Sequence, residues 1–209
     1  MKIAIFGGTG QTGQVFLKQA LEEGHELKVL ARSPEKLPEH ERLQTVVGSV
    51  EELEKVKETI AGSEAVVSFL GHTKNSPENL LRTAMEHIVR TMEAKQISRL
   101  VVMSGAAVEH EKDKPGVMDH VIRFAMGTFA KKVLTDAQAA ARVVADSGLD
   151  WTIVRAPRLS NKAGGAEVHV GYLGEAGIST QVTRADVGRK ILKIVQTDEW
   201  VHEMPVVSN

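Results

Sequence analysis

Glycines near the start of the chain are spaced in a way that could hold a phosphate group. Gly8-x-Gly10-x-x-Gly13 follows the short apolar run Lys2–Phe6, and the looser spacing Gly7-x-x-Gly10-x-x-Gly13 fits the chain equally well. In such a turn one glycine permits tight bending, one lets backbone N–H groups approach a pyrophosphate, and one allows a helix to pack closely on a strand. A helix that begins here adds unpaired N–H groups and the positive end of its dipole.

Arg32 ends the second apolar run, Glu26–Ala31, and indicates which dinucleotide the turn would bind. An NAD site places Asp or Glu there, to accept hydrogen bonds from the ribose 2′-OH. A guanidinium instead matches a 2′-phosphate bidentately, whereas a carboxylate would repel it. Ser33 follows directly, and Lys36 adds charge one turn later. These residues predict NADP(H) as the cofactor; the alternative is that Arg32 is a solvated strand end with no ligand.

The chain alternates between apolar runs typical of buried strands and segments with helical spacing, joined by short connections. Such alternation predicts an α/β fold, a single-domain doubly wound parallel sheet (Rossmann) with helices on both faces. The predicted strands are 2–6, 26–31, 43–47, 65–70, 100–103, 151–155 and 204–207. The predicted helices run from the glycine turn to Gly24 and over about 50–60, 79–95, 117–134, 135–145 and 183–195.

Strand ends in this kind of sheet face the crevice where a ligand lies. Ser49 and Val50 follow the third predicted strand, so we expect them to border the adenine.

Two later segments are predicted to form a substrate-covering portion of the single domain 1–209, at about 109–134 and 156–182. Met126 and Phe129 lie at helical spacing in the first, which suits an apolar cover over an aromatic substrate or, equally, a core helix. In the second, the glycine-rich residues 163–177 predict a hairpin-like flap. Arg158 is placed either to engage an anionic substrate group or on the surface.

Composition excludes several other classes of protein. Among 209 residues the net charge is −1, which gives no support to binding of nucleic acid or an acidic membrane. Cysteine is absent, so disulfides and thiolate sites are excluded, and the eight histidines show no metal-ligand spacing. No apolar run has the length of a membrane span, and the first strand already begins at Lys2. We expect a cytoplasmic protein without a signal peptide, and a monomer.

The glycine turn, Arg32, the stretch 146–157 (DSGLDWTIVRAP) and the helix start 183–187 (TRADV) together resemble the atypical short-chain dehydrogenase/reductase superfamily. The resemblance covers nearly the whole chain. It is strongest to the NAD(P)H-binding group that contains biliverdin-IXβ reductase/flavin reductase and the NmrA-like proteins. It implies that the pyrophosphate is held by Gly7, Thr9, Gly10, Gln11 and Thr12. It also implies that the nicotinamide side is bordered by Leu70, Gly71, His72, Ser104 and Gly105, with Pro157 closing over it.

One departure from the superfamily bears directly on the reaction. Short-chain dehydrogenases protonate their substrate with a Tyr-x-x-x-Lys pair, yet Val133 and Ala137 align with those positions and the only tyrosine is Tyr172. The flavin/biliverdin reductases also lack this tyrosine. There hydride passes to an electron-poor ring and the proton can come from solvent, so stacking of the two rings suffices. Ser104, beside the position of their serine at Gly105, is the candidate catalytic residue; alternatively, its hydroxyl only satisfies local backbone.

The sequence therefore predicts an NADPH-dependent oxidoreductase that transfers hydride to free flavin or a similar planar conjugated acceptor, such as a biliverdin-type tetrapyrrole or a quinone. The rival interpretation is an NmrA-like protein that senses NADP(H) and regulates a partner without turnover. An epimerase-like activity is disfavoured by the missing tyrosine.

Overall fold

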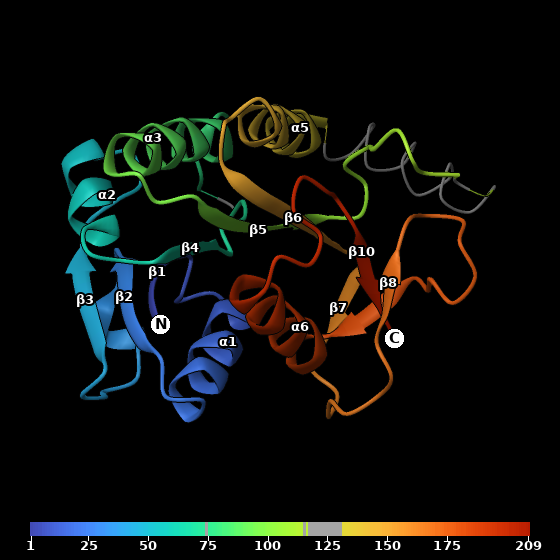
Figure 1. Cartoon of the computed structure of the whole chain (residues 1–209), viewed down its shortest axis with the longest axis horizontal. Helices are drawn as coiled ribbons and strands as arrows, with labels where there is room; N and C mark the ends of the chain where they lie inside the picture. The colour runs from blue at the N-terminus through green and yellow to red at the C-terminus, as the bar shows by residue number, and fades with distance from the viewer. Residues whose placement is uncertain (74, 115, 117–130) are drawn as a thin grey trace.

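In the computed structural model one main sheet lies between two layers of helices (Figure 1). The structure describes residues 1–73, 75–114, 116 and 131–209. The strands in these ranges are β1 (Lys2–Phe6), β2 (Glu26–Ala31), β3 (Leu43–Val47), β4 (Ala65–Ser68), β5 (Arg99–Gly105), β6 (Asp150–Ala156), β7 (Arg158–Ser160), β8 (His169–Gly171), β9 (Gln181–Thr183) and β10 (Val206–Ser208). The helices are α1 (Gln11–Glu22), α2 (Leu53–Ile60), α3 (Leu80–Lys95), α5 (Lys131–Ala145) and α6 (Arg184–Gln196), with a short 3-10 helix, η1 (Pro34–Lys36).

The main sheet has the strand order β3-β2-β1-β4-β5-β6-β10-β8. Its strands are parallel, except that β8 runs antiparallel to β10 at one edge. The chain moves outward from β1 to β3 and then returns to place β4 on the other side of β1. This reversal is the switch point at which doubly wound sheets bind their ligands. The predicted fold class is confirmed.

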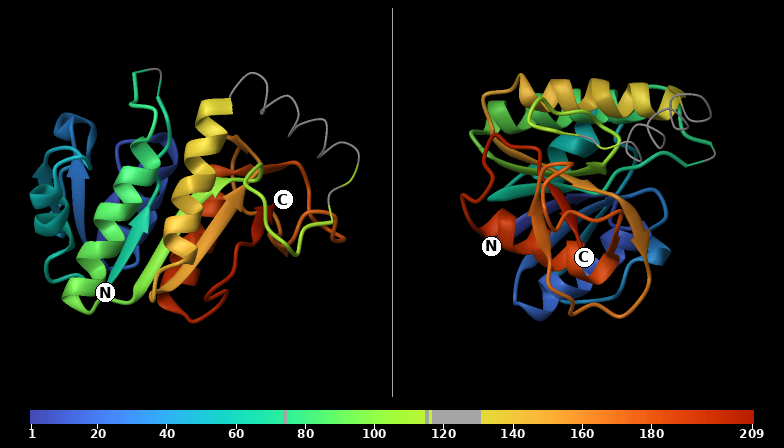
Figure 2. Two further views of the ribbon diagram at one scale, coloured as in Figure 1. Left: turned by 90° about the horizontal axis from the view of Figure 1, so that it is seen from above. Right: turned by 90° about the vertical axis from the view of Figure 1, so that its right-hand side faces the viewer.

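Alternate side chains of each strand face opposite layers of helices. In β1, Ile3 and Ile5 pack against α1 and α6, whereas Ala4 and Phe6 pack against α2 and α3. This alternation explains why the run is apolar throughout, since both faces of the strand are covered. Figure 2 shows α3 and α5 lying side by side across one face, in agreement with their many contacts.

Helix α5 begins at Lys131, four residues before the predicted helix 135–145. Leu134, Ala137 and Ala141 pack on the same core, so the helical face continues through the predicted boundary. The rest of the other predicted helix, residues 117–130 with Met126 and Phe129, lies outside the described residues.

The predicted hairpin at 163–177 is wrong. Its strand-forming part, β8, pairs instead with β10 at the end of the chain, with Gly171 opposite Val206. In the same way β7 pairs with β9 in a separate two-stranded parallel sheet, with Ser160 opposite Thr183. The strands that pair here are distant in sequence. The turn-forming residues of this stretch could not indicate that pairing, because they specify only local hairpins.

Thr183, the first residue of the predicted helix 183–195, caps the start of α6. The Thr183 hydroxyl accepts a hydrogen bond from the Asp186 N–H and donates one to the Asp186 carboxylate. That carboxylate also accepts from the Gly165 N–H and the Asn209 amide, so it ties two distant segments to the start of α6.

Candidate active site

The glycine turn lies at the carboxyl end of β1, directly against the end of β4. Gly7 has a φ of +81°, and an added Cβ there would lie 2.7 Å from the Phe69 carbonyl carbon and 2.9 Å from the Leu70 nitrogen. At Gly13 an added Cβ would lie 2.3 Å from the Gly7 oxygen. A side chain at either position would therefore push the turn away from the helix or from β4. The close approach that the sequence assigned to these glycines is present.

The first turn of α1 is open to an anion. Its N-cap residue, Gly10, has no side chain, and the first turn carries no acidic residue. In the described part of the chain no group accepts from the N–H groups of Gln11, Thr12 or Gly13. Free N–H groups at a helix start, together with the helix dipole, are suited to a pyrophosphate. The cradle thus fits the dinucleotide that the glycine pattern predicts.

Arg32 directly follows β2, at the same carboxyl end of the parallel strands as the glycine turn. Its side chain is exposed and makes no hydrogen bond or ion pair with any described residue. Ser33 is half-buried and precedes η1, and the exposed Lys36 ends it, with a backbone carbonyl that accepts from Gln14 on α1. An unpaired guanidinium beside the cradle is free to bind a phosphate.

The two residues expected near an adenine differ in exposure. Ser49 is half-buried, its N–H donates to Glu52 and its hydroxyl contacts Glu51. Val50 is buried in the core, and its carbonyl accepts from His87 of α3. Ser49 therefore has the more accessible side chain of the pair.

A cavity of about 300 Å³ lies at the carboxyl ends of β4, β5 and β6, beneath α3 and α5. We call it the strand-end cavity. Its wall is mostly apolar, with Leu81 and Met85 from α3 and Val133 and Leu134 from α5. The sequence-predicted residues that line it are Leu70, Gly71, His72, Ser104, Gly105 and Pro157. The structure thus brings together every residue expected on the nicotinamide side, and Leu70 links the cavity to the glycine turn.

Ser104 lies near the end of β5, opposite Arg155 of β6 in the strand register. It is half-buried in the cavity wall, and its hydroxyl has no hydrogen-bond partner among the described residues. The alternative expectation, that this hydroxyl satisfies local backbone, has no hydrogen bond to support it there.

The helix α5 positions expected for the missing acid pair line the cavity with apolar groups. Val133 and Ala137 are both in its wall. Tyr172 lies elsewhere: its hydroxyl donates to Glu203, and its ring stacks on His110. Burial and the Glu203 carboxylate raise the pKa of Tyr172 above its ordinary value. This phenol therefore neither reaches the cavity nor ionises readily.

Arg158 does not line the cavity, so of the two placements expected for this substrate candidate the structure shows the surface one. Its neighbours Pro157 and Leu159 line the wall, but Arg158 is exposed and donates to the Gln181 side chain. Because side chains alternate along β7, Leu159 and Arg158 point to opposite faces.

Sequence analysis missed a polar pair beside the cavity. His72 Nε2 lies 2.7 Å from the Asp136 carboxylate, and the Asp136 side chain is only 1% exposed. The resemblance placed His72 on the nicotinamide side, but sequence reasoning gave its imidazole no chemical role and did not single out Asp136. The partners are 64 positions apart, so no local spacing could join them. The available signal was that Asp136 adjoins Ala137, one of the two positions aligned with the acid pair.

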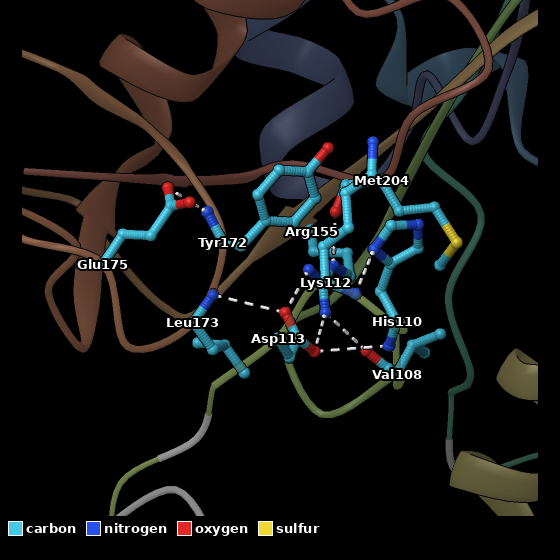
Figure 3. A network of polar contacts seen from close by, with 9 residues as sticks. All are labelled: Val108, His110, Lys112, Asp113, Arg155, Tyr172, Leu173, Glu175 and Met204. Atoms are coloured by element: carbon cyan, nitrogen blue, oxygen red, sulfur yellow. Dashed lines mark hydrogen bonds and ion pairs between the residues drawn. The ribbon is translucent and has the colours of Figure 1, made fainter.

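A buried ion pair fixes the wall formed by residues after β5 (Figure 3). Arg155 and Asp113 form two hydrogen bonds of 2.7 Å, and their side chains are 0% and 3% exposed. Arg155 also donates to the carbonyls of Val108 and Met204, while Leu173 donates to Asp113. We call this group the Arg155–Asp113 clamp; it holds the segment containing Val108, a cavity residue, against β6.

The Asp113 carboxyl remains ionised because of its partner. Burial alone would raise its pKa, but hydrogen bonds from Arg155 and the guanidinium charge outweigh burial and hold the pKa below its ordinary value.

In the part of the chain that the structure describes, no helix has the length and hydrophobicity needed to cross a membrane. There is also no group of three or more His, Asp or Glu residues there that could hold a metal ion.

A family model described as NAD(P)H-binding matches residues 7–198, which include the glycine cradle, Arg32 and every described residue that lines the cavity. The chain belongs to the NAD(P)H-binding family. Membership in this family, predicted from the sequence, is confirmed, and it establishes a nicotinamide dinucleotide as the cofactor class.

Relatives of this NAD(P)H-binding protein include oxidoreductases. The oxidoreductase AflX of Aspergillus parasiticus is 25% identical, over 99% of this chain and 82% of its own. A short-chain dehydrogenase/reductase of Veillonella parvula, solved with NADP, has a TM-score of 0.83 at 21% identity, covering 100% of this chain and 94% of that one. ChuY, an anaerobillin reductase of Escherichia coli O157:H7, has a TM-score of 0.78 at 18% identity, covering 100% and 97%. The two structures show a shared fold.

Proposed function

We propose that this protein is an NADPH-dependent reductase of free flavin or a similar planar conjugated acceptor, such as a biliverdin-type tetrapyrrole or a quinone. The strand-end cavity carries the proposal. It is apolar, and it adjoins the glycine cradle through Leu70. Val133 and Ala137, which the sequence aligns with the acid pair of a conventional dehydrogenase, line it with apolar side chains. A slot without that pair suits an acceptor ring that is held by stacking and burial.

The chain's own residues would hold the cofactor at two places. The N–H groups of Gln11 and Thr12, together with the cradle at Gly7, would bind the pyrophosphate, and Arg32 would bind the 2′-phosphate. Residues 70–72, 104–105 and 157 would border the nicotinamide, which supplies a hydride when it is bound.

The cavity wall would orient the acceptor and exclude water. Leu81, Met85 and Val133 offer apolar surface on the helix side, while Pro157 and Leu159 lie on the strand side. Methionine adapts to rings of different shape, so such a wall would accept more than one planar substrate. Holding two rings in contact contributes to the rate by replacing a bimolecular encounter with an ordered one.

The known relatives support the oxidoreductase part of the proposal. AflX is named as an oxidoreductase, and ChuY, whose fold this chain shares, is named as an anaerobillin reductase. Neither identifies the acceptor of this protein.

The test is NADPH oxidation, followed by absorbance, with FMN, FAD, riboflavin, biliverdin and a quinone, each repeated with NADH. We expect turnover of one of these acceptors, with a strong preference for NADPH. Tight NADP(H) binding with no turnover on any acceptor would contradict the proposal and would support the redox-sensing regulator instead.

A further inference from the structure

His72 is the only ionisable side chain among the described residues that line the strand-end cavity. The other polar side chains in the wall are the serines Ser68 and Ser104. A serine hydroxyl can pass on a hydrogen bond, but only an imidazole can hold and release a proton near neutral pH. Among the described residues of the cavity wall, His72 is therefore the side chain that can donate a proton to a bound ring.

Asp136 holds this imidazole in a fixed orientation. Besides contacting His72 Nε2, the carboxylate accepts from the N–H groups of Leu81 and Arg82, at 2.8 and 3.1 Å. These N–H groups belong to the first turn of α3, so the carboxylate is itself anchored to a helix start. The imidazole thus bonds to a buried group that two main-chain donors hold still.

The contact also fixes which ring nitrogen is left without a protein partner among the described residues. An ionised carboxylate can only accept, so Nε2 of His72 must carry the proton that joins them. Nδ1 has no hydrogen-bond partner among the described residues. Nδ1 is therefore the atom available to a ligand, and in the imidazolium form it is a donor.

Resting on the reductase function proposed above, we infer that His72 is the general acid of the reaction and that Asp136 is its positioning residue. When a conjugated acceptor gains a hydride, it gains negative charge on a ring oxygen or nitrogen. The His72 imidazolium transfers its Nδ1 proton to that atom, the new O–H or N–H bond forms, and the neutral imidazole regains a proton from water. The acid thus reaches the ring from the end of β4, and not from α5.

This assignment narrows the class of acceptor. A quinone or a tetrapyrrole needs a proton on the atom that takes up the charge, and so it benefits from a fixed acid. Ser104 then serves as a hydrogen-bonding group beside the ring.

The first test needs no turnover. In ¹⁵N-labelled protein, the His72 shifts report which nitrogen is protonated, and we expect a protonated Nε2 in the neutral ring. Asp136→Asn keeps an oxygen for the α3 N–H groups, but its amide can also donate to the ring, so the preference for the Nε2 proton should be lost. The same tautomer in both proteins would overturn the positioning role.

The second test is kinetic, with a quinone as acceptor. His72→Phe should lower kcat by about 10²- to 10⁴-fold, the usual contribution of a positioned acid, with a much smaller effect on the Kd for NADPH. Asp136→Asn should lower kcat about 10- to 100-fold, the scale found when the partner that orients a metal-bound histidine is removed. Added imidazole should restore part of the rate of His72→Ala.

His202→Gln is the matched control. This exposed histidine also bonds through Nε2, to the Leu149 carbonyl, but Leu149 precedes β6 and so lies at the opposite edge of the sheet. It should keep the wild-type kcat. An unchanged kcat in His72→Phe would overturn the acid assignment and leave the reductase function standing. Loss of NADPH binding in His72→Phe would also overturn it, in favour of a structural role. Wild-type protein that binds NADPH and reduces no acceptor would overturn both proposals.

Discussion

At the scale of single residues, the contacts of a polar side chain in the described part of the chain indicate whether it serves a ligand or the fold. Arg32 and Ser104 make no side-chain hydrogen bond to the described residues, whereas the buried Arg155 and Arg99 make several. An exposed polar group at a strand end can hydrogen-bond to water when no ligand is bound, so leaving it without a protein partner costs little. The same group is free to form hydrogen bonds with a ligand. The two arginine types therefore predict opposite consequences of substitution: loss of binding at Arg32, loss of folding at Arg155.

Arg32→Ala should weaken NADPH binding about 10- to 100-fold and leave NADH binding nearly unchanged, because it removes charge-assisted hydrogen bonds to the 2′-phosphate alone. Kd values for both cofactors, measured by fluorescence titration, check this. Arg32→Lys is the control and should lie between, since it keeps the charge but loses the bidentate contact. Equal losses for both cofactors would remove Arg32 from this role.

Ser104→Ala should leave a substantial rate, because a group that only orients the rings contributes a single hydrogen bond of about 1 kcal/mol. Steady-state kinetics with the best acceptor would measure it. A fall in kcat of several orders of magnitude would instead indicate that Ser104 lies on a specific proton path. Ser104 would then be a rival to His72 as the general acid.

At the scale of elements, two helices and three strand ends create the cavity that no single element contains. The wall that α5 contributes is set by the spacing of its residues: Val133, Ala137 and Ala141 lie four residues apart and line the cavity together. The segment after β5 is held by the Arg155–Asp113 clamp, so the opposite wall does not depend on its own local preferences.

Ala137→Leu should raise the KM for the acceptor with little change in the Kd for NADPH, because the larger side chain occupies part of the cavity. Ala145→Leu is the matched control on the same helix: Ala145 is exposed and does not line this cavity. Initial rates over a range of acceptor concentrations distinguish the two variants. An unchanged acceptor KM in Ala137→Leu would place the acceptor elsewhere.

At the scale of the whole molecule, the clamp joins β6 to the loop after β5, to the turn after β8 and to the stretch before β10 (Figure 3). These segments are separated by up to about a hundred positions in the sequence. One buried ion pair therefore holds together several distant segments of the C-terminal half. The hydrogen bonds of Asp186 to Gly165 and Asn209 do the same at the start of α6.

Asp113→Asn should lower the free energy of unfolding by about 3–5 kcal/mol at neutral pH, because it leaves the Arg155 charge buried without a counterion. Urea denaturation of both proteins measures this difference, and an unchanged midpoint would contradict the clamp.

The same pair predicts acid sensitivity. The folded-state pKa of Asp113 lies below its ordinary value of 3.8, so the unfolded chain binds the proton more readily. The stability that the ionised Asp113 carboxylate contributes is fully present above pH 3.8 and is lost as the pH falls through the folded-state pKa. Wild-type stability should therefore decline more steeply below pH 3.8 than that of Asp113→Asn. Equal slopes in urea midpoints against pH would contradict this origin.

The amino-acid sequence by itself determined the first βαβ unit, the glycine cradle, the class of cofactor and the residues that end each strand. These are local properties: a period of apolar residues, glycines at fixed spacing and a charge after a strand all act within about thirty positions. Because parallel strands end on one edge of the sheet, naming the strand ends was enough to name most of the cavity's polar and backbone residues.

Only the tertiary structure decided that His72 meets Asp136, that Arg158 turns away from the cavity, and that β8 pairs with β10 rather than folding into a hairpin. Each depends on contacts between segments that are distant in sequence, or on which face of a short strand is covered. Local sequence preferences cannot indicate these contacts or the covered face of a strand. The partner of a buried carboxylate or of a strand edge depends on how the whole chain packs.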